Sequence, residues 1–318
     1  RPDDARQGWI SGLNEEDGEH HPTAGGLRIG KALNERGPND PFDERLEWDR
    51  DGQYFHYLTK WMHALFCAGR VMQVAKYGRW AAELAQVAHA GFARALRPDG
   101  DQRLVWKMSI DLSRPLVPSS GLHDPLDAYV TYSELCLRPV PEDGLSQYPD
   151  LSAEIAAVAT MNRGQRWATG DPLGIGGLLF DACRVFQLAA LGLPGNVRLA
   201  ATLLRDARSS LADYVSRCVL KQPAECRLAF REFGLSIGLK AIGKMENVRR
   251  DHSKDFGARI ARDLEELSSY AALGKRIEDF WRDPTHQQVP GWQEHRDINN
   301  VMLATSLLPG EFLRVIDA

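Results

Sequence analysis

Residues 171–191 read DPLGIGGLLFDACRVFQLAAL, an Asp-Pro start signal followed by an almost continuous apolar run. Asp before Pro is typical of a helix N-cap followed by the first helical residue. A helix that is apolar on nearly every side is buried on two faces. This stretch therefore predicts an inner helix that other helices cover.

The same kind of helix recurs along the chain in both directions from this stretch. Apolar helices are predicted to begin near residues 53, 124, 172, 225 and 295, and amphipathic helices near 79, 150, 197 and 255. Successive apolar helices start roughly 50 to 70 residues apart, a spacing found in arrays of helical hairpins. The alternation predicts two layers, in which the inner helices run the same way and their N-termini meet at one end.

The predicted helices span residues 54–71, 79–96, 124–137, 150–163, 171–191, 196–218, 225–245, 254–282 and 295–308. A short extended segment is predicted at 103–111, ended by two prolines. The first fifty residues are rich in Gly, Pro, Asp and Glu, which predicts an irregular segment. We expect it to be ordered, with anchors at Trp9, Ile29, Phe42, Leu46 and Trp48.

Composition limits the class of protein. The 318 residues are 43% hydrophobic and 26% charged, as in ordinary globular domains. A net charge of −4 argues against a nucleic-acid partner. No run of 18 apolar residues and no signal-peptide pattern are present, so we expect a cytoplasmic protein with no membrane partner. The chain begins Arg1-Pro2 without Met, which is typical of a truncated or processed end.

The cysteines also favour a cytoplasmic protein. The five cysteines, an odd count, include no C-x-x-C pair, and most lie in apolar helical runs. This indicates reduced, structural thiols rather than a zinc knuckle. No H-E-x-x-H or comparable spacing is present, so no metal and no cofactor are predicted. Residues 234–238, GLSIG, match G-x-S-x-G by chance inside a helix.

Polar clusters at the starts of the predicted inner helices indicate a pocket. In the first, His56, Lys60 and His63 are spaced i, i+4 and i+7 and share one helix face. This stripe lines either a cavity or a buried hydrogen-bond network. In the second, His123 and Asp127 form either a tuned acid/base pair or an inert ion pair, while Asp124 before Pro125 is typical of an N-cap.

The remaining clusters follow the same pattern. Asp171 is a predicted N-cap, and the glycines at 174, 176 and 177 indicate a close approach of another backbone or a ligand. Arg227 and Arg231 need anions, supplied by Glu232 or by an acidic substrate. His295, Asp297 and Asn299 place polar groups at the start of the last inner helix, as caps or as a cavity end.

One motif carries a resemblance to a known family. The segment 105–115, VWKMSIDLSRP, followed by residues 123–127, HDPLD, resembles the β-hairpin and polar helix start of the N-acylglucosamine 2-epimerase group of the six-hairpin superfamily. The resemblance covers residues 50–306. It implies one all-α domain over 1–318, an (α/α)6-type barrel with short β-hairpin excursions. Its sixth inner helix either lies upstream or is replaced by residues 1–50.

The clusters and the resemblance together predict a carbohydrate-active enzyme with a sugar or oligosaccharide substrate. The catalytic candidates are His56, His123, His295, Asp127, Asp297 and Glu232. The substrate-binding candidates are Asp51, Tyr54, Lys60, Trp106, Lys107, Asp111, Arg114, Asp171, Arg227, Arg231 and Asn299. The first hypothesis is a sugar epimerase or isomerase that uses histidine acid/base chemistry. The alternatives are a glycoside hydrolase or polysaccharide lyase with paired carboxylates, and a helical scaffold or binding protein without catalysis.

Overall fold

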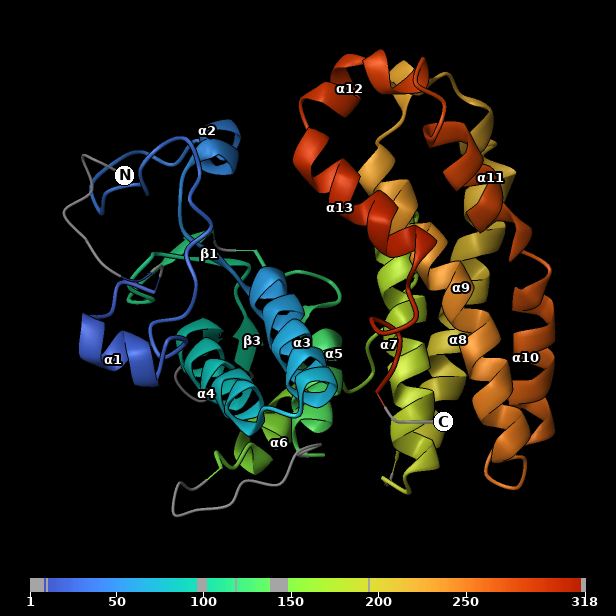
Figure 1. Cartoon of the computed structure of the whole chain (residues 1–318), viewed down its shortest axis with the longest axis horizontal. Helices are drawn as coiled ribbons and strands as arrows, with labels where there is room; N and C mark the ends of the chain where they lie inside the picture. The colour runs from blue at the N-terminus through green and yellow to red at the C-terminus, as the bar shows by residue number, and fades with distance from the viewer. Residues whose placement is uncertain are drawn as a thin grey trace. The chain divides into compact units, whose positions relative to one another are not determined.

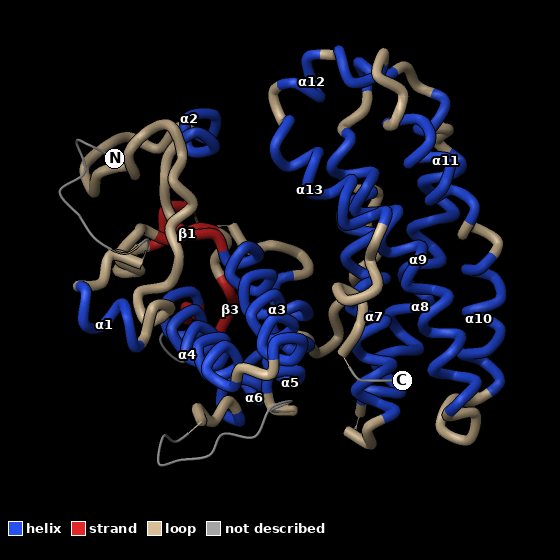
Figure 2. The backbone as a smooth tube through the Cα atoms, in the orientation of Figure 1, coloured by secondary structure: helices blue, strands red, loops and turns tan. Residues whose placement is uncertain are grey.

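The computed structural model describes residues 9, 11–95, 102–117, 119–137, 148–193 and 195–315 (Figure 1). These residues are mostly helical, with a few short strands (Figure 2), which confirms the all-α class. The chain divides into two compact units, Arg1–Gly164 and Gln165–Ala318.

The first unit contains six helices and five strands among its described residues. Its helices are α1 (Glu15–His20), α2 (Glu44–Asp49), α3 (Phe55–Met72), α4 (Ala75–Phe92), α5 (Asp124–Leu135) and α6 (Ser152–Met161). Its strands are β1 (Gln53–Tyr54), β2 (Ala93–Ala95), β3 (Gln102–Leu104), β4 (Lys107–Met108) and β5 (Pro115–Val117). β2 pairs with β3, and β1, β4 and β5 form an antiparallel sheet in the order β1-β4-β5.

Helices α3 and α4 form a hairpin around the core of this unit. Phe55, Leu58, Met62 and Phe66 of α3 repeat at helical spacing, and all four are fully buried. They pack against buried alanines, leucine and phenylalanine of α4. The chain reverses at Gln73, whose φ of 56° ends α3 in the left-handed conformation. The predicted extended segment after α4 is confirmed as β3 and β4.

Helices α3 and α5 run in the same direction. Lys60 near the start of α3 pairs with Asp127 near the start of α5, and His63 further along α3 pairs with Glu134 further along α5. Paired positions that advance together define parallel helices. The predicted direction of the inner helices therefore holds in this unit.

The first fifty residues are anchored differently from the prediction. Trp9, Phe42, Leu46 and Trp48 are 39–52% exposed, so they are not buried anchors. Polar contacts fix the segment, because the fully buried Asp51 accepts hydrogen bonds from Arg28 and from the backbone of Gly30. A loop that is poor in buried apolar area is here ordered by hydrogen bonds to its backbone.

The second unit is built of helices alone in its described residues. They are α7 (Pro172–Ala190), α8 (Asn196–Ser216), α9 (Ala229–Asp251), α10 (Ala258–Ser268), α11 (Ala272–Trp281), α12 (Pro290–Gln293) and α13 (Arg296–Leu307), with 3₁₀ turns η1 (Val219–Lys221), η2 (Ala224–Cys226) and η3 (His286–Gln288). The starts of α7 and α9 meet through Asp171 and Arg231, and Lys240 further along α9 donates to the Ser306 carbonyl near the end of α13. These three helices therefore run in one direction. The prediction of an inner helix at 295–308 is wrong, because only Asn299 and Ser306 of α13 are buried and Val301 is 63% exposed.

The predicted helix over 254–282 is wrong, because the structure breaks it into α10 and α11 at residues 269–271. Two serines explain the break. Ser268 Oγ donates to the Leu264 carbonyl, and Ser269 Oγ donates to the Glu266 carbonyl at 2.6 Å. Serine hydroxyls that bond the preceding turn compete with the backbone and weaken a helix at that point.

Glycine residues allow the backbones of helices α7 and α9 to approach each other closely. A Cβ built on Gly176 would lie 2.0 Å from the Gly234 carbonyl oxygen, and one on Gly238 would lie 2.6 Å from the Gly176 oxygen. The close approach predicted for the glycines of α7 is thus confirmed at Gly176. It is wrong at Gly177, where a Cβ meets nothing within 4 Å. The GLSIG match lies inside α9, where Ser236 is buried and donates to Glu278, as expected of a chance match.

We expect Gly176→Ala to destabilise the protein by at least 1–3 kcal/mol, the usual cost of overpacking, because the new Cβ meets rigid backbone. Gly177→Ala is the matched control. It lies one residue away in open space and should stabilise by up to about 1 kcal/mol through helix propensity. Urea unfolding of both variants measures the difference. Equal effects of the two substitutions would contradict glycine-mediated packing of α7 on α9.

Helix α7 is the one described helix that is long and apolar enough to cross a membrane by length and composition. Within the structure, 78% of its apolar window is buried. That degree of burial is typical of the core helix of a folded domain.

All five cysteines are free thiols. Cys183 is buried, as expected for a structural thiol, but Cys136, Cys218 and Cys226 are exposed. The expectation that most lie inside apolar helical runs is therefore wrong. The exposed three fall at or beyond helix ends, where the apolar pattern stops.

Candidate functional site

A pocket of about 470 Å³ lies in the first unit, beside the sheet and the loop that leads into α5. Its walls come from α2, from Trp106 before β4, and from the segment after β5. They combine exposed aromatic rings with small polar groups: Phe42, Trp48, Trp106, Ser119, Ser120 and Gly121. Glu44 and Glu47 add carboxylates from α2. The composition suits a polar ligand with a flat apolar face.

Aromatic rings pack around Trp106. The ring centroids of Trp48 and Tyr54 lie 4.8 Å and 4.9 Å from that of Trp106, both edge-to-face. The His56 ring lies parallel to it, at 6.3 Å and an interplanar angle of 9°. Edge-to-face packing is a favoured aromatic geometry and fixes each ring's orientation. Trp106 is therefore held with the predicted site residues Tyr54 and His56 beside it.

Lys107, a predicted substrate-binding residue, positions α2 instead of lining the pocket. It is fully buried, and its Nζ donates to the carbonyl oxygens of Glu47 at 2.6 Å and Arg50 at 2.9 Å. These carbonyls belong to the end of α2, where a cation is favoured by the unpaired C=O groups. Burial lowers the pKa of Lys107, partly offset by Glu47. The contact fixes the helix that carries Trp48.

Three other predicted residues hold the scaffold around the pocket. Asp51 anchors the N-terminal segment, and although burial opposes it, hydrogen bonds from Gly52 and Arg28 lower its pKa. Asp111 closes the β4–β5 turn by accepting from Ser109 and Ser113, which lowers its pKa. Arg114 donates to the backbone carbonyl of Arg36. These three side chains therefore stabilise the scaffold and are not part of the site.

Asp127 is the centre of an ion pair between α3 and α5. Lys60 Nζ lies 2.9 Å from both of its carboxylate oxygens, and Thr59 Oγ1 donates to Oδ2. Asp127 is buried, while Lys60 is 42% exposed. A carboxylate that accepts from an ammonium and a hydroxyl is held in its ionised form. Lys60 and Asp127, each predicted as a site residue but not as partners, are thus brought together at the helix starts.

Asp124 lies one turn before Asp127 in α5, but its surroundings favour the protonated form of the carboxyl group rather than the ionised form. Its side chain is buried, and burial, with the nearby Asp127 charge, raises its pKa to about 7. Its Oδ2 accepts no hydrogen bond from the described residues. A Cβ built on the pocket residue Gly121 would lie 2.3 Å from this oxygen, so only a glycine backbone separates the carboxyl from the pocket wall.

The predicted capping role of Asp124 is wrong. Asp124 is the first residue of α5, His123 occupies the N-cap position, and no side chain among the described residues caps this helix end. The Asp-Pro pattern shifted the predicted cap by one residue, because Pro125 takes the second helical position. His123 itself is partly buried at the pocket end of α5.

His56, at the start of α3, is the candidate for a base that is neutral at pH 7. It is the second residue of α3 and is partly buried beside Tyr57 and Trp106. Burial, followed by the positive charge of Lys60, lowers its pKa to about 4. His56 is therefore unprotonated at neutral pH, when Asp124 is close to half protonated.

The predicted residues of the second unit form internal contacts. Arg227 is buried and binds Glu232 with two hydrogen bonds, Nε to Oε1 at 2.8 Å and the second to Oε2 at 2.6 Å. Its guanidinium lies 3.7 Å from the Phe280 ring centroid, and Trp281 Nε1 donates to Glu232. The interpretation of Arg227 and Glu232 as an internal salt bridge accounts for these contacts.

The other predicted residues of this unit lie near the helix starts. Asp171 accepts from the Gly174 backbone at 3.0 Å, which confirms its capping role, and from Arg231 at 2.7 Å. Asn299 is buried and donates to the Trp292 carbonyl. His295 and Asp297 are exposed, and the rings of His295 and Phe230 pack edge-to-face.

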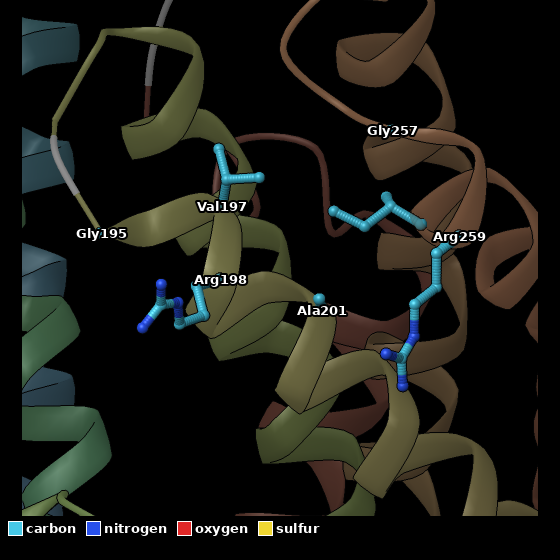
Figure 3. Close-up of a pocket in the computed structure, with 7 residues that line it drawn as sticks. Gly195, Val197, Arg198, Ala201, Gly257 and Arg259 are labelled. Carbon is cyan, nitrogen blue, oxygen red and sulfur yellow. The ribbon is translucent and has the colours of Figure 1, made fainter.

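A second pocket, of about 510 Å³, lies at the starts of α8 and α10 (Figure 3). Its lining includes Gly195, Val197 and Gly257 and two arginines. Arg198 and Arg259 are exposed, and their side chains extend in different directions (Figure 3). Because the charged groups do not converge, this pocket lacks the fixed polar set of a binding site.

No known protein family, curated protein or solved structure matches this chain. The candidate site therefore stands on its own geometry. Of the residues that line the pocket, only Trp106 was predicted from the sequence as a site residue. The others were missed, and so was Asp124, which was interpreted as a cap. The signal for Asp124 was its position one turn before Asp127, since two adjacent carboxylates cannot ionise equally.

Proposed function

We propose that the pocket of the first unit binds a sugar and that His56 and Asp124 exchange protons with it, as in a sugar epimerase or isomerase. The observation that carries the proposal is that each of the two groups adjoins a residue that lines the pocket. The unprotonated His56 lies parallel to the Trp106 ring, and the proton-carrying Asp124 lies against Gly121. Epimerisation by proton transfer requires a base that removes a proton and an acid that returns one.

The protonation states support this assignment of roles. With its pKa lowered to about 4, His56 is free to accept a proton at neutral pH. With its pKa raised to about 7, Asp124 keeps a proton available in the same range. Environments that push two titratable groups apart are the usual sign of divided acid and base roles.

The aromatic walls support a sugar as the ligand. The aromatic rings of Trp48 and Trp106 line the pocket, and Ser119 and Ser120 supply hydroxyl groups beside them. A pyranose has an apolar face of C–H groups and a rim of hydroxyls, which matches this division. The volume of about 470 Å³ suits a small saccharide.

A glycoside hydrolase is the second candidate, favoured by the contrast between Asp124 and Asp127. One carboxyl would act as the acid and the other as the base or nucleophile. Asp127, however, already accepts from Lys60 and Thr59, so its oxygens are occupied. This occupancy favours a charge-holding role for Asp127 and supports the isomerase over the hydrolase.

An (α/α)-barrel of the six-hairpin type is part of the same proposal. In the first unit α3 and α5 are parallel, with α4 as the returning helix, and in the second unit α7, α9 and α13 are parallel. The buried parallel pairs α3 with α5 and α7 with α9, which alternate with returning helices, support this arrangement. The sequence resemblance to the N-acylglucosamine 2-epimerase group also supports the proposal of this barrel.

Sugar binding is tested by titrating the protein with a panel of monosaccharides and following tryptophan fluorescence. We expect Trp106→Ala to weaken the binding of the responding sugar at least tenfold, because it removes a stacking face from the pocket. Trp61→Ala, which removes an exposed tryptophan of α3 that does not line the pocket, should leave affinity unchanged. Equal affinity of the Trp106→Ala variant and the wild type would contradict the placement of the site.

A further inference from the structure

The contact between α3 and α5 continues beyond Lys60 and Asp127 to a second group of polar side chains. His63 and Cys67 are four residues apart and share one face of α3, and Glu134 faces them from α5. His63 Nδ1 lies 2.9 Å from both oxygens of Glu134, and Cys67 Sγ lies 3.5 Å from His63 Nε2. One donor atom from each of the three lies within 4.8 Å of the others.

Burial distinguishes this group from a surface cluster. His63 is 1% exposed and Glu134 is fully buried, while Cys67 is partly exposed. A carboxylate in such a place needs compensating positive charge. The partly exposed thiol gives an ion a route to the two buried ligands.

We propose that His63, Cys67 and Glu134 bind a divalent transition metal ion of the Zn²⁺ type, which joins α3 to α5. One nitrogen, one sulfur and one oxygen form a donor set that suits Zn²⁺ and its neighbours, whereas Mg²⁺ and Ca²⁺ take oxygen ligands. With a thiolate and a carboxylate as ligands, a divalent ion forms a neutral complex, which is favourable in a buried site.

The ligand spacing is close to what such an ion requires. Bond lengths of about 2.0–2.3 Å to nitrogen, oxygen and sulfur place tetrahedral ligand atoms roughly 3.3–3.7 Å apart. The donor atoms here lie within 4.8 Å, so binding needs them to approach by roughly 1 Å. Three protein ligands leave a fourth position for water or for another ligand.

The position along α3 indicates a structural role for the ion. His63 follows His56 by seven residues, about 10 Å along the helix. The ion would hold the helices together at a point two turns from the proposed acid/base groups. The metal site is therefore independent of the proposed sugar chemistry.

The test is titration of the reduced, chelator-treated protein with Co²⁺, whose bonds to thiolate give a charge-transfer absorption in the near ultraviolet. We expect one equivalent to produce this band in the wild type and in Cys226→Ser, which removes an exposed thiol of the second unit. Cys67→Ser should abolish the band, and His63→Gln should weaken Co²⁺ binding at least tenfold. Far-UV circular dichroism checks that both variants are folded.

A second measurement uses Zn²⁺ and thermal unfolding. Because an ion that binds only the folded state stabilises it, Zn²⁺ should raise the Tm of the wild type by several degrees and leave that of Cys67→Ser unchanged. No band in the wild type, or a band that persists in Cys67→Ser, would overturn the proposal.

Discussion

Asp124→Asn is expected to lower kcat/KM by 10²- to 10⁴-fold while making the protein more stable at pH 8. The loss of activity follows from removal of the proton donor, whose usual contribution has this size. The gain in stability has a different cause. At pH 8 the wild type must carry a buried, ionised carboxylate next to Asp127, whereas asparagine is neutral.

The size of the stability change follows from the pKa. The pKa of Asp124 rises from 3.8 to about 7 on folding, and each unit corresponds to about 1.4 kcal/mol, so the upper limit is about 4 kcal/mol. The folded state binds the Asp124 proton more tightly between these two values. The free energy of unfolding therefore falls as pH rises through that window and stays low above it.

His56 has the opposite effect on stability. Its pKa falls from 6.5 to about 4 on folding, so the unfolded state binds the proton more tightly and stability rises as pH rises through this window. Between pH 4 and pH 6.5 the two slopes cancel in the wild type. Asp124→Asn removes one of them, so the stability of this variant should rise with pH over that range.

Urea unfolding of wild type and variant at intervals from pH 4 to pH 8 measures these slopes. Asp297→Asn is the matched control, because it makes the same chemical change at an exposed position of the second unit. It should alter neither activity nor the pH profile. If Asp124→Asn were less stable than the wild type at pH 8, Asp124 would not be a buried carboxyl of raised pKa.

Arg227→Met is expected to destabilise the protein by 3–5 kcal/mol, the usual cost of leaving one member of a buried ion pair without its partner. Glu232 would remain buried with only Trp281 Nε1 as a donor among the contacts described above. The variant would also lose the stacking of the guanidinium on Phe280.

Two variants control this prediction. Arg231→Met breaks a pair with Asp171 in which both side chains are more than one third exposed, so it should cost no more than about 1 kcal/mol. The double variant Arg227→Met/Glu232→Gln removes both charges and keeps an acceptor for Trp281, so it should recover part of the loss. Urea unfolding at pH 7 measures all three. A cost for Arg227→Met below that of Arg231→Met would contradict a structural role for the buried pair.

Most helices could be predicted from the sequence, because the residues that determine them lie close together along the chain. Apolar runs such as that of α7 and the Asp171 cap depend on residues a few positions apart. The break in 254–282 was missed because Ser268 and Ser269 are compatible with a helix until their hydroxyls bond the preceding turn. Such competition between side chain and backbone does not alter the apolar pattern.

The candidate site follows from the sequence only in part. The face shared by His56, Lys60 and His63 was readable from spacing, and Asp127 was found as a carboxylate at the start of its helix. The partners were not readable, because Lys60 and Asp127 are 67 residues apart and meet only when α3 packs on α5. The role of Lys107 could likewise not be predicted, because its Nζ meets the Glu47 carbonyl at the end of α2 only in the folded structure.

The pocket predicted to hold His56, His123 and His295 together stays a prediction, because the three lie in two different units. His56 and His123 lie in the first unit, and His295 lies exposed in the second. The sequence suggested one pocket because all three begin apolar helices, and a shared position in a repeat does not fix which helices pack together.

The central claim is that His56 and Asp124 move protons on a bound sugar. The most direct test is incubation of the protein with a panel of monosaccharides in D₂O, followed by NMR of the sugars. We expect at least one sugar to gain deuterium at the carbon that loses its proton. This exchange should be abolished in His56→Gln and Asp124→Asn but not in Asp297→Asn. Failure of every sugar to exchange, or exchange at the wild-type rate in both variants, would contradict it.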